Sequence, residues 1–461
     1  MTPRAKRTLQ VVGLLAVLAL LLPITNLLTG PPSGTPLTAV AAKDAATVKV
    51  AHTLERSCAN CHVPGVKTPF YAKLPIASTI VERDVKAGLR NFDLARGFAT
   101  AATGPVPEPV VAMIEREVKE SAMPPLPFVA MHWNARLDAG ERRAILDWAQ
   151  NARAAQAAPG VPELLRSQVI RPLPAKLDHD PAKAALGRKL YHDKRLSGDD
   201  TLSCASCHDL AKGGTDNETY SDGIRKQKGG INAPTTFNAA LNFVQYWDGR
   251  APTLEAQAGG PPLNPVEMGS SGWPQIVEKL NKDKALRKEF EAIYPEGVSE
   301  KTITGAIAEF ERTLLTPNSR FDRFLAGDEA ALSAPEKHGY EVFVAKGCAS
   351  CHVGELLGGK SFEVMGRRTD YFGARRDVMT GADDGRYNVT KNDADRHYFK
   401  VPTLRNVART SPYFHDGSKR TLPGAVDAMA TYQLGAPLRE DDLNDVVRFL
   451  ETLTGEYDGK A

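Results

Sequence analysis

Cys204-Ala205-Ser206-Cys207-His208 is the stretch that decides how this chain folds, because its pattern of two cysteines and a histidine occurs three times. The other copies are Cys58-Ala59-Asn60-Cys61-His62 and Cys348-Ala349-Ser350-Cys351-His352. The chain has 461 residues and 6 cysteines, and every cysteine belongs to one of these copies. No cysteine is left for a disulfide or for a lone nucleophile.

The spacing within each copy fits the covalent attachment of a porphyrin. Two thiols three positions apart can each form a thioether with one vinyl group of the same ring, and the next histidine then places its imidazole on the iron. C-x-x-C-H is the attachment signal for c-type haem. Zinc binding or a redox C-x-x-C is the alternative, but zinc sites usually combine two ligand pairs, and these copies are far apart. We therefore predict three covalently bound haem c groups, with His62, His208 and His352 as iron ligands.

The N-terminal residues predict attachment to a membrane. Basic residues at positions 4–7 precede an uncharged, mostly apolar run over 9–28, and about 20 apolar residues form a helix that crosses a bilayer. Basic residues at the start of such a helix stay in the cytoplasm. The expected location is the bacterial inner membrane, with the haem domains in the periplasm. A cleaved signal peptide ending at the small residues 39–41 is the alternative, and it also exports the protein.

Amino-acid composition and the positions of the prolines predict how the remainder of the chain is divided into domains and linkers. A hydrophobic content of 42% and a charged content of 25% are typical of a globular protein, and a net charge of +3 gives no basic patch for nucleic acid. Prolines between 159 and 181 prevent a continuous helix there. The predicted segments are a transmembrane anchor (1–30), a linker (31–47), an N-terminal haem-binding domain (48–155), a linker (156–175), a second haem domain (176–316) and a third (317–461).

Hydrophobic periodicity predicts a mostly α fold with three cytochrome c-like domains and long loops. Apolar residues at helical spacing indicate a closing helix around 141–149 and a last helix over 441–453. Helices are also expected over 182–192 and 335–346, each ahead of a haem motif, which suggests a duplicated domain. No alternating run is long enough for a main sheet.

The sixth iron ligand decides what each haem does, since methionine suits electron transfer and an open position admits peroxide. Met123 lies in Ala122-Met123-Pro124-Pro125, on the loop before the predicted closing helix, and is the expected ligand of the first haem. Met131 is the alternative. Met429 lies shortly before the last predicted helix and is the expected ligand of the third haem.

From about residue 182 to 455 the sequence resembles the bacterial di-haem cytochrome c peroxidases and their relative, the MauG maturase. The matching stretches are specific in combination: Leu196-Ser197, Gly213-Gly214-Thr215-Asp216, Asn232-Ala233-Pro234-Thr235, Trp247-Asp248-Gly249-Arg250, Val266-Glu267-Met268, Thr403-Leu404-Arg405-Asn406-Val407 and Pro412-Tyr413-Phe414-His415-Asp416-Gly417. With its extra N-terminal haem unit and apolar anchor, the whole chain is similar to the three-haem quinol peroxidases.

The resemblance implies that peroxide reacts at the haem of His208. Glu267 and Gln257 match the family's distal pair, in which the carboxylate moves a proton between the peroxide oxygens and the amide orients the peroxide. Trp247 matches the tryptophan that conducts electrons between two haems.

The resemblance also implies that the haem of His352 is the high-potential donor, with Met429 as ligand. MauG uses tyrosine there, and Tyr432 is close by in this sequence.

Two further features concern a metal ion and a loop. Asn232, with the backbone oxygens of Thr410 and Pro412, matches the family's inter-domain calcium site.

Many members place a histidine in the loop between residues 214 and 232, where it caps the peroxidatic iron until the enzyme is reduced. This loop has no histidine, and Ile224 occupies the matching position. The iron at His208 is therefore expected to be open or water-bound in the oxidised protein.

The prediction is a membrane-anchored peroxidase that reduces hydrogen peroxide to water, with electrons from quinol or a small redox protein entering at the first haem. A three-haem cytochrome that only transfers electrons is one alternative, and a MauG-like oxidase that modifies a protein partner is another. Met429 argues against the oxidase, because methionine ligation does not favour a long-lived high-valent haem pair. A homodimer is left open.

Overall fold

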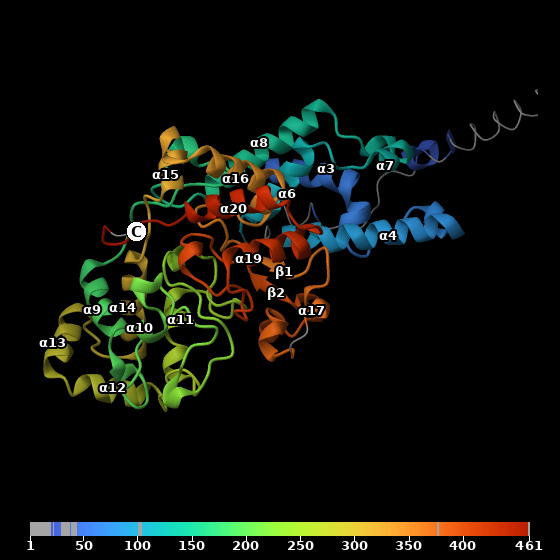
Figure 1. Cartoon of the computed structure of the whole chain (residues 1–461). Coiled ribbons are helices and arrows are strands. Elements are labelled where there is room, and N and C mark those ends of the chain that lie inside the picture. The colour runs from blue at the N-terminus through green and yellow to red at the C-terminus, as the bar shows by residue number, and fades with distance from the viewer. Residues whose placement is uncertain are drawn as a thin grey trace, which may run out of the picture. The chain divides into compact units, whose positions relative to one another are not determined.

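The computed structural model describes residues 20–21, 23–28, 37, 44–99, 104–375 and 378–459. The chain divides into two compact units, which we call unit 1 (Met1–Gln156) and unit 2 (Ala157–Ala461). Helices dominate both units, and the described residues contain one two-stranded sheet (Figure 1). The prediction of a mostly helical chain is confirmed.

Unit 1 is a small helical domain around the first C-x-x-C-H motif, which ends its first long helix. Besides helical residues at 23–28, its helices in the described residues are α3 (Ala45–His62), α4 (Pro75–Asn91), α5 (Leu94–Ala99), α6 (Glu108–Lys119), α7 (Leu126–Met131) and α8 (Ala139–Gln156). Ile145, Trp148 and Ala149 of α8 are buried in one apolar cluster with Leu54 of α3 and Val111 of α6. The predicted closing helix is therefore present and packs by the predicted face.

Unit 2 holds the other two motifs. Its helices are α9 (Pro181–Tyr191), α10 (Cys204–Cys207), α11 (Leu254–Ala258), α12 (Trp273–Asn281), α13 (Lys284–Ile293), α14 (Glu300–Thr313), α15 (Arg320–Leu325), α16 (Ala334–Ala345), α17 (Tyr371–Ala374), α18 (Tyr387–Thr390), α19 (Leu422–Met429) and α20 (Glu440–Glu451). Strands β1 (Phe362–Val364) and β2 (Tyr398–Lys400) pair antiparallel, with Phe362 opposite Lys400. The predicted helices before the second and third motifs are α9 and α16, and the predicted last helix is α20.

A close crossing of α9 and α14 supports the second motif. A Cβ atom on Gly187 of α9 would lie 1.8 Å from the carbonyl oxygen of Ala306 in α14, so the two backbones touch. One turn further on, the rings of Tyr191 and Phe310 meet edge-on with centroids 5.2 Å apart. The Tyr191 hydroxyl then donates to the carbonyl of His208 at 2.6 Å. The crossing therefore fixes the position of the second haem-binding histidine.

The same arrangement recurs at the third motif, where α16 crosses α20. A Cβ atom on Gly339 would lie 1.9 Å from the carbonyl oxygen of Asp445. Phe343, again four residues after the glycine, packs on Phe449 with ring centroids 5.3 Å apart and lies 6.2 Å from the ring of His352. The repeated contact supports the duplication that the placement of the motifs suggested.

The segment over 156–175, predicted as a linker, is partly built into unit 2. Residues 170–174 are buried, and the guanidinium of Arg171 pairs with the Glu355 carboxylate at 2.8 Å with neither side chain exposed. Arg405 donates to the carbonyls of both residues, at 2.9 and 2.7 Å. Removing one partner of a buried pair leaves an uncompensated charge, so this segment belongs to the core beside the third motif.

The apolar run over 9–28, predicted to cross the membrane, lies largely outside the described residues. Among the helices of the described part, none has both the length and the apolar character that a bilayer crossing requires.

The crossing predicts a specific loss of stability for Gly187→Ala. The added methyl group meets a backbone carbonyl that no side-chain rotation can remove, and overpacking of this kind costs about 1–3 kcal/mol. Thermal unfolding followed by circular dichroism should show a clearly lower Tm. Gly305→Ala in α14 is the matched control, because the nearest atom to its Cβ is the Tyr294 hydroxyl at 3.6 Å. Equal Tm values for the two variants would contradict the proposed role of the crossing.

Candidate active site

The three motif histidines share one orientation. In each, ring atom Nδ1 lies next to a backbone carbonyl; because a carbonyl only accepts, Nδ1 carries the hydrogen and Nε2 is left as the ligand nitrogen. The carbonyl partners of His62, His208 and His352 are, in that order, those of Phe92 at 2.8 Å, Gly214 at 3.3 Å and Leu357 at 2.8 Å. This is the arrangement that an iron-bound imidazole needs.

Each motif also adjoins its own apolar cluster. Cys58 packs on the core of unit 1, Cys204 on a cluster around Tyr191 and Phe310, and Cys348 on a cluster around Phe343 and Phe449. All six cysteines are free thiols. Apolar surroundings with two available thiols and an oriented imidazole fit a covalently attached haem c at each of the three positions.

A cavity of about 750 Å³ in unit 2 contains two of the predicted catalytic residues, Glu267 and Trp247. Arg250 and Asn264 also line it, as does Phe399 of β2. Cavities of roughly 300–1,000 Å³ are the size that binds small molecules and cofactors. The structure therefore brings the predicted carboxylate and the predicted tryptophan to the same cavity.

The environment of Glu267 suits a proton-transferring carboxylate. Burial raises the pKa of Glu267, while the charge of Arg250 and a hydrogen bond from Asn264 act in the opposite direction. The Asn264 amide donates to a Glu267 carboxylate oxygen at 2.8 Å. A pKa moved up towards neutrality is what a residue needs to accept and return a proton.

Asn264 is a site residue that our sequence reasoning missed. It begins a turn three residues before Glu267, and its side chain also accepts from the Val266 backbone at 3.0 Å. The signal was present in the sequence as Asn264-Pro265, because asparagine before proline favours turns of this kind.

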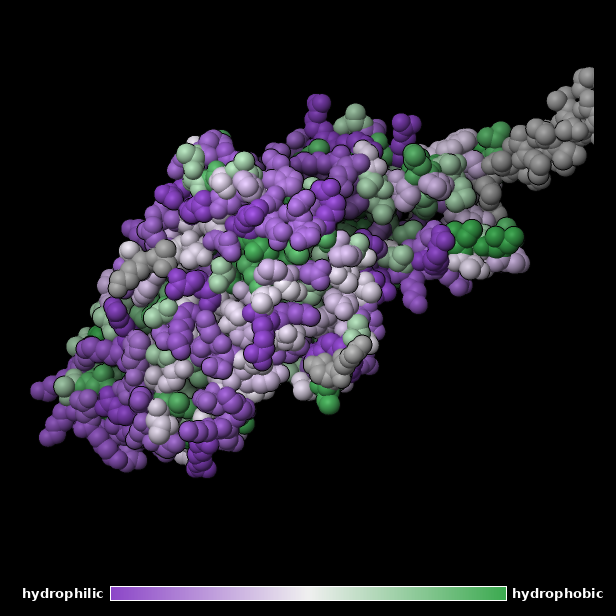
Figure 2. All heavy atoms as spheres, in the orientation of Figure 1, coloured by the Kyte–Doolittle hydropathy of each residue, from purple (hydrophilic) through white to green (hydrophobic). Residues whose placement is uncertain are grey.

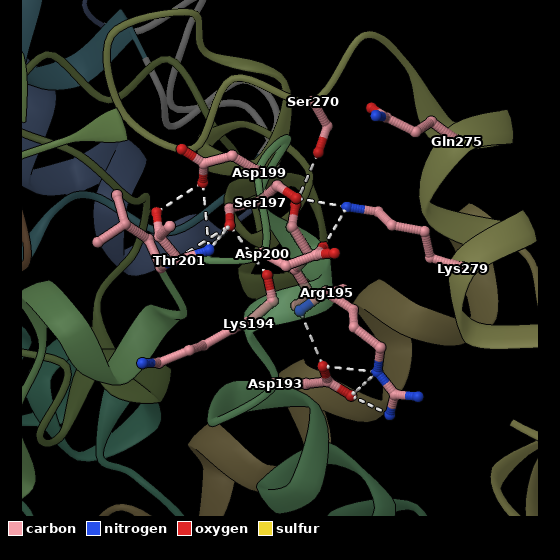
Figure 3. A network of polar contacts seen from close by, with 12 residues as sticks. Asp193, Lys194, Arg195, Ser197, Asp199, Asp200, Thr201, Ser270, Gln275 and Lys279 are labelled. Carbon is pink, nitrogen blue, oxygen red and sulfur yellow. Dashed lines mark hydrogen bonds and ion pairs between the residues drawn. The ribbon is translucent and has the colours of Figure 1, made fainter. Parts of the chain in front are cut away.

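Backbone bonds fix the Glu267 segment against the loop that enters the second motif. The amide of Gly198 donates to the carbonyl of Met268 at 2.7 Å, and the Ser270 hydroxyl donates to the carbonyl of Leu196 at 2.9 Å. Figure 3 shows the polar network around this loop, in which Lys279 bonds the carbonyl of Ser197 and the carboxylate of Asp200. Glu267 and the second motif are thus held in one framework.

The loop without a histidine lies beside Glu267. Ile224 is buried, with 3% of its surface exposed, and its amide donates to the carbonyl of Glu267 at 2.6 Å. Its side chain also lies against Gly269, since a Cβ atom there would be 3.0 Å from Ile224 carbons. An aliphatic side chain has no atom that can bind iron, so this loop cannot cap the His208 site through Ile224.

Gln257 is not among the residues that line the cavity of Glu267. Its backbone carbonyl accepts from the Tyr246 hydroxyl at 3.0 Å, and its side chain does not line the cavity. Within the described part of unit 2, no hydrogen bond joins the Gln257 side chain to Glu267. The predicted role of Gln257 in orienting peroxide stays a prediction.

The predicted methionine ligands are all half-buried. Met123 lies between α6 and α7, and the alternative Met131 ends α7. Met429 ends α19 and is followed directly by a π-helical turn over Ala430–Leu434; such turns occur frequently at functional sites. Tyr432, in that turn, packs edge-on against Tyr371 with ring centroids 5.1 Å apart.

Asn232 connects Trp247 to the segment that carries the other predicted calcium ligands. The Trp247 indole donates to the Asn232 carbonyl at 2.9 Å, and the Asn232 amide donates to the carbonyl of His415, three residues after Pro412, at 2.8 Å. The Asn232 side-chain nitrogen donates to the carbonyl of Glu218 at 2.9 Å. That bond leaves the side-chain oxygen of Asn232 as a hard ligand for a cation.

A buried ionic cluster behind Trp247 also escaped the sequence reasoning. The His415 ring lies 6.4 Å from that of Trp247, and its Nε2 atom is 2.8 Å from the carboxylate of Asp383. Asp383 and Asp416 could in principle hold a metal ion with His415. The Arg375 guanidinium lies 2.5 and 3.1 Å from their carboxylates and already provides the positive charge.

Comparisons with known proteins agree with this geometry. The family model described as di-haem cytochrome c peroxidase matches residues 181–330, a haem-binding domain matches 20–151, and cytochrome c matches 336–454. Cytochrome c peroxidase Ccp of Escherichia coli is 47% identical over 407 residues, which cover 87% of this chain and 86% of that protein. Cytochrome c551 peroxidase of Nitrosomonas europaea is 44% identical, over 63% of this chain and 85% of its own.

Relatives of the MauG type are more distant. Methylamine utilization protein MauG of Methylorubrum extorquens is 33% identical over 60% of this chain and 79% of its own length. A solved structure of a MauG-like protein associated with microbial copper homeostasis has a TM-score of 0.56 and 30% identity, covering 63% of this chain and 94% of that one. The chain is therefore a peroxidase-type enzyme and belongs to the di-haem cytochrome c peroxidase and MauG family, with a further haem-binding domain at its N-terminal end.

Proposed function

We propose that this chain is a membrane-anchored, periplasm-facing peroxidase with three haem c groups, which reduces hydrogen peroxide to two waters. One observation carries the proposal: Glu267, a half-buried carboxylate with a raised pKa, lines the same cavity as Trp247, and its neighbours Met268 and Ser270 bond to the loop that enters the second motif. Quinol or a small redox protein supplies the electrons. The uncharged apolar residues over 9–28 support the anchor.

The histidine orientations and the apolar surroundings of the cysteines support three haem sites. The cysteine pairs would bind the porphyrins, and His62, His208 and His352 would present Nε2 to the irons, with Met123 and Met429 as further iron ligands of the first and third haems. Bound at His208, haem c supplies an iron on which peroxide can be reduced. The other residues of the site would bind and orient the peroxide and transfer its protons.

Lys400 of β2 supports the presence of an anionic cofactor in unit 2. Its side chain is buried, with 7% of the residue exposed, and burial lowers its pKa to about 8. Within the described residues it forms no ion pair with a carboxylate. A buried ammonium group is costly unless it is paired, and a haem propionate is an anion that could pair with it.

Glu267 would act as the general base and then the general acid. It takes the proton from the peroxide oxygen nearer the iron and returns it to the farther oxygen, which leaves as water when the O–O bond breaks. Gln257 would orient the peroxide. Trp247 would conduct the electrons that arrive from the third haem, and the Asn232 bond to its indole fixes the ring. A calcium ion on Asn232, Thr410 and Pro412 would stiffen this connection.

We expect Glu267→Gln to lower peroxide turnover about 10²–10⁴-fold, the range of general acid–base catalysis. The amide keeps the size of the side chain but cannot accept the proton. Steady-state peroxide reduction is measured with quinol and with reduced cytochrome c. Glu278→Gln is the control, because Glu278 on α12 has 71% of its side chain exposed. A full rate in Glu267→Gln would show that the assigned role is wrong, and wild-type protein without turnover would favour a purely electron-transferring cytochrome.

The pH profile should depend on Asn264. Turnover requires ionised Glu267, so it falls as the pH drops through the Glu267 pKa. The Asn264 hydrogen bond lowers that pKa, so in Asn264→Ala the pKa rises and the acid limb of the profile of kcat/KM moves to higher pH. Asn388→Ala is the matched control, because Asn388 lines the same cavity but donates to the Gly381 carbonyl. An acid limb that stays in place in Asn264→Ala would argue against Glu267 as the titrating base.

The spin state of the haem iron in the oxidised protein tests whether the loop with Ile224 leaves the site at His208 open. We expect electronic and EPR spectra of the air-oxidised protein to contain a high-spin ferric signal, because Ile224 offers no ligand to the iron at His208. Ile224→His should convert that signal to low-spin, and Ile224→Leu should leave it unchanged. Only low-spin haem in the wild-type oxidised protein would contradict an open site.

A further inference from the structure

Unit 1 exposes large apolar side chains on neighbouring segments. Ile76 and Leu126 have 81% and 85% of their surface exposed, and the indole of Trp133 is 46% exposed. We call Leu74, Ile76, Ile80, Leu126 and Trp133 the apolar patch. Figure 2 shows hydrophobic surface over α4 and beside α7. Exposed apolar groups that gather in this way mark a surface that meets another molecule.

A buried polar pair holds the two sides of the patch together. The hydroxyl of Tyr71, in the 3-10 turn η1 (Phe70–Lys73), lies 3.0 Å from Nε2 of His132. His132 follows α7, precedes Trp133 and stacks on Phe128 with ring centroids 4.0 Å apart. Leu74 follows η1 directly, so this bond brings the start of α4 next to α7.

The apolar N-terminal run joins unit 1 at the same place. Residues 9–28 carry no charge, residues 23–28 are helical, and the side-chain amide of Asn26 donates to the carbonyl of Met131 in α7 at 2.8 Å. Leu27 and Leu28 beside it are 51% and 80% exposed. A lipid bilayer that contains the apolar run would therefore also contact the apolar patch.

The patch is close to the first haem motif. A Cβ atom on Gly88 of α4 would lie 2.2 Å from the Cys61 carbonyl oxygen, so α4 touches the motif through its backbone. Burial, with the nearby Cys61 thiol as a second cause, raises the pKa of Tyr71 to about 12. A donor bound at the patch would thus lie near the place where electrons enter.

We propose that the apolar patch is the docking surface for a lipid-soluble quinol presented by the membrane, a site that rests on the quinol donor of the proposed function. The isoprenoid tail and ring of a quinol match the leucine and isoleucine side chains, and the half-exposed indole of Trp133 suits the boundary between lipid and water. Exposed Lys67 and Lys73 in the same region would meet anionic headgroups.

The oxidation of quinol by hydrogen peroxide balances in electrons and protons without a further reactant. One quinol loses two electrons and two protons in becoming a quinone, and one peroxide takes up two electrons and two protons in becoming two waters.

The test compares Ile76→Asn and Leu126→Asn in the full-length holoprotein, embedded in phosphatidylglycerol-containing vesicles. Each change removes an apolar contact, and we expect kcat/KM for a ubiquinol analogue to fall about tenfold. Turnover with a water-soluble reductant such as ascorbate with a phenylenediamine mediator should stay within twofold of wild type. Leu164→Asn is the matched control, because Leu164 is also 85% exposed but lies in unit 2.

Each outcome decides the matter. A selective loss with quinol in both patch variants and none in Leu164→Asn supports the site. Wild-type rates with quinol in both variants would overturn it, and so would an equal loss with reduced cytochrome c, which would make the patch a protein-docking surface. Failure of the proposed function has a different signature, since the wild-type protein would then turn over no peroxide with any donor.

Discussion

The crossing of two helices through a glycine is the contact on which the catalytic unit depends. In α9 and α14, as in α16 and α20, backbone meets backbone at Gly187 and Gly339. The aromatic residue one turn later then reaches the haem-binding histidine, through the Tyr191 hydroxyl in one case and the Phe343 ring in the other. A side chain at either glycine would separate the helices and shift the aromatic residue with them. The position of each haem ligand is therefore set by how closely two helices approach.

A second constraint places the catalytic carboxylate. Glu267 comes from a loop that is remote in sequence from the second motif, yet bonds through Gly198 and Ser270 hold the two segments together. Because the bonds are between backbone groups or involve a serine hydroxyl, they fix the path of the chain and leave the carboxylate to face the cavity. Ile224 docks on the same segment. One framework thus positions both the proposed proton-transferring residue and the loop in which Ile224 offers no iron ligand.

The two units contribute different surfaces to the proposed reaction. Unit 2 encloses the cavity with Glu267 and Trp247, where burial raises the pKa of the carboxylate. Unit 1 has a haem motif with an apolar patch beside it, and residues 23–28 at the end of the apolar N-terminal run contact the same region through Asn26. The proposed proton transfer uses the half-buried carboxylate of unit 2, whereas the proposed quinol donor uses the exposed apolar side chains of unit 1.

The sequence by itself determined the features that depend on local spacing. Three C-x-x-C-H copies specify haem attachment because the thiols and the imidazole are neighbours in the chain, and helical periodicity located α8, α9, α16 and α20. The stretches shared with the peroxidase family pointed to Glu267 and Trp247. These predictions needed no knowledge of which segments meet.

Only the tertiary structure decided the contacts between distant segments. The burial of Arg171 against Glu355, the bonds that join the Glu267 segment to Leu196 and Gly198, and the approach of Tyr71 to His132 depend on chain folding that no short-range pattern encodes. Gln257 matches the family pattern, and its role in orienting peroxide stays a prediction. A spacing rule reports which groups are adjacent along the chain, whereas burial, which raises the pKa of Glu267 and lowers that of Lys400, depends on everything that packs around a group.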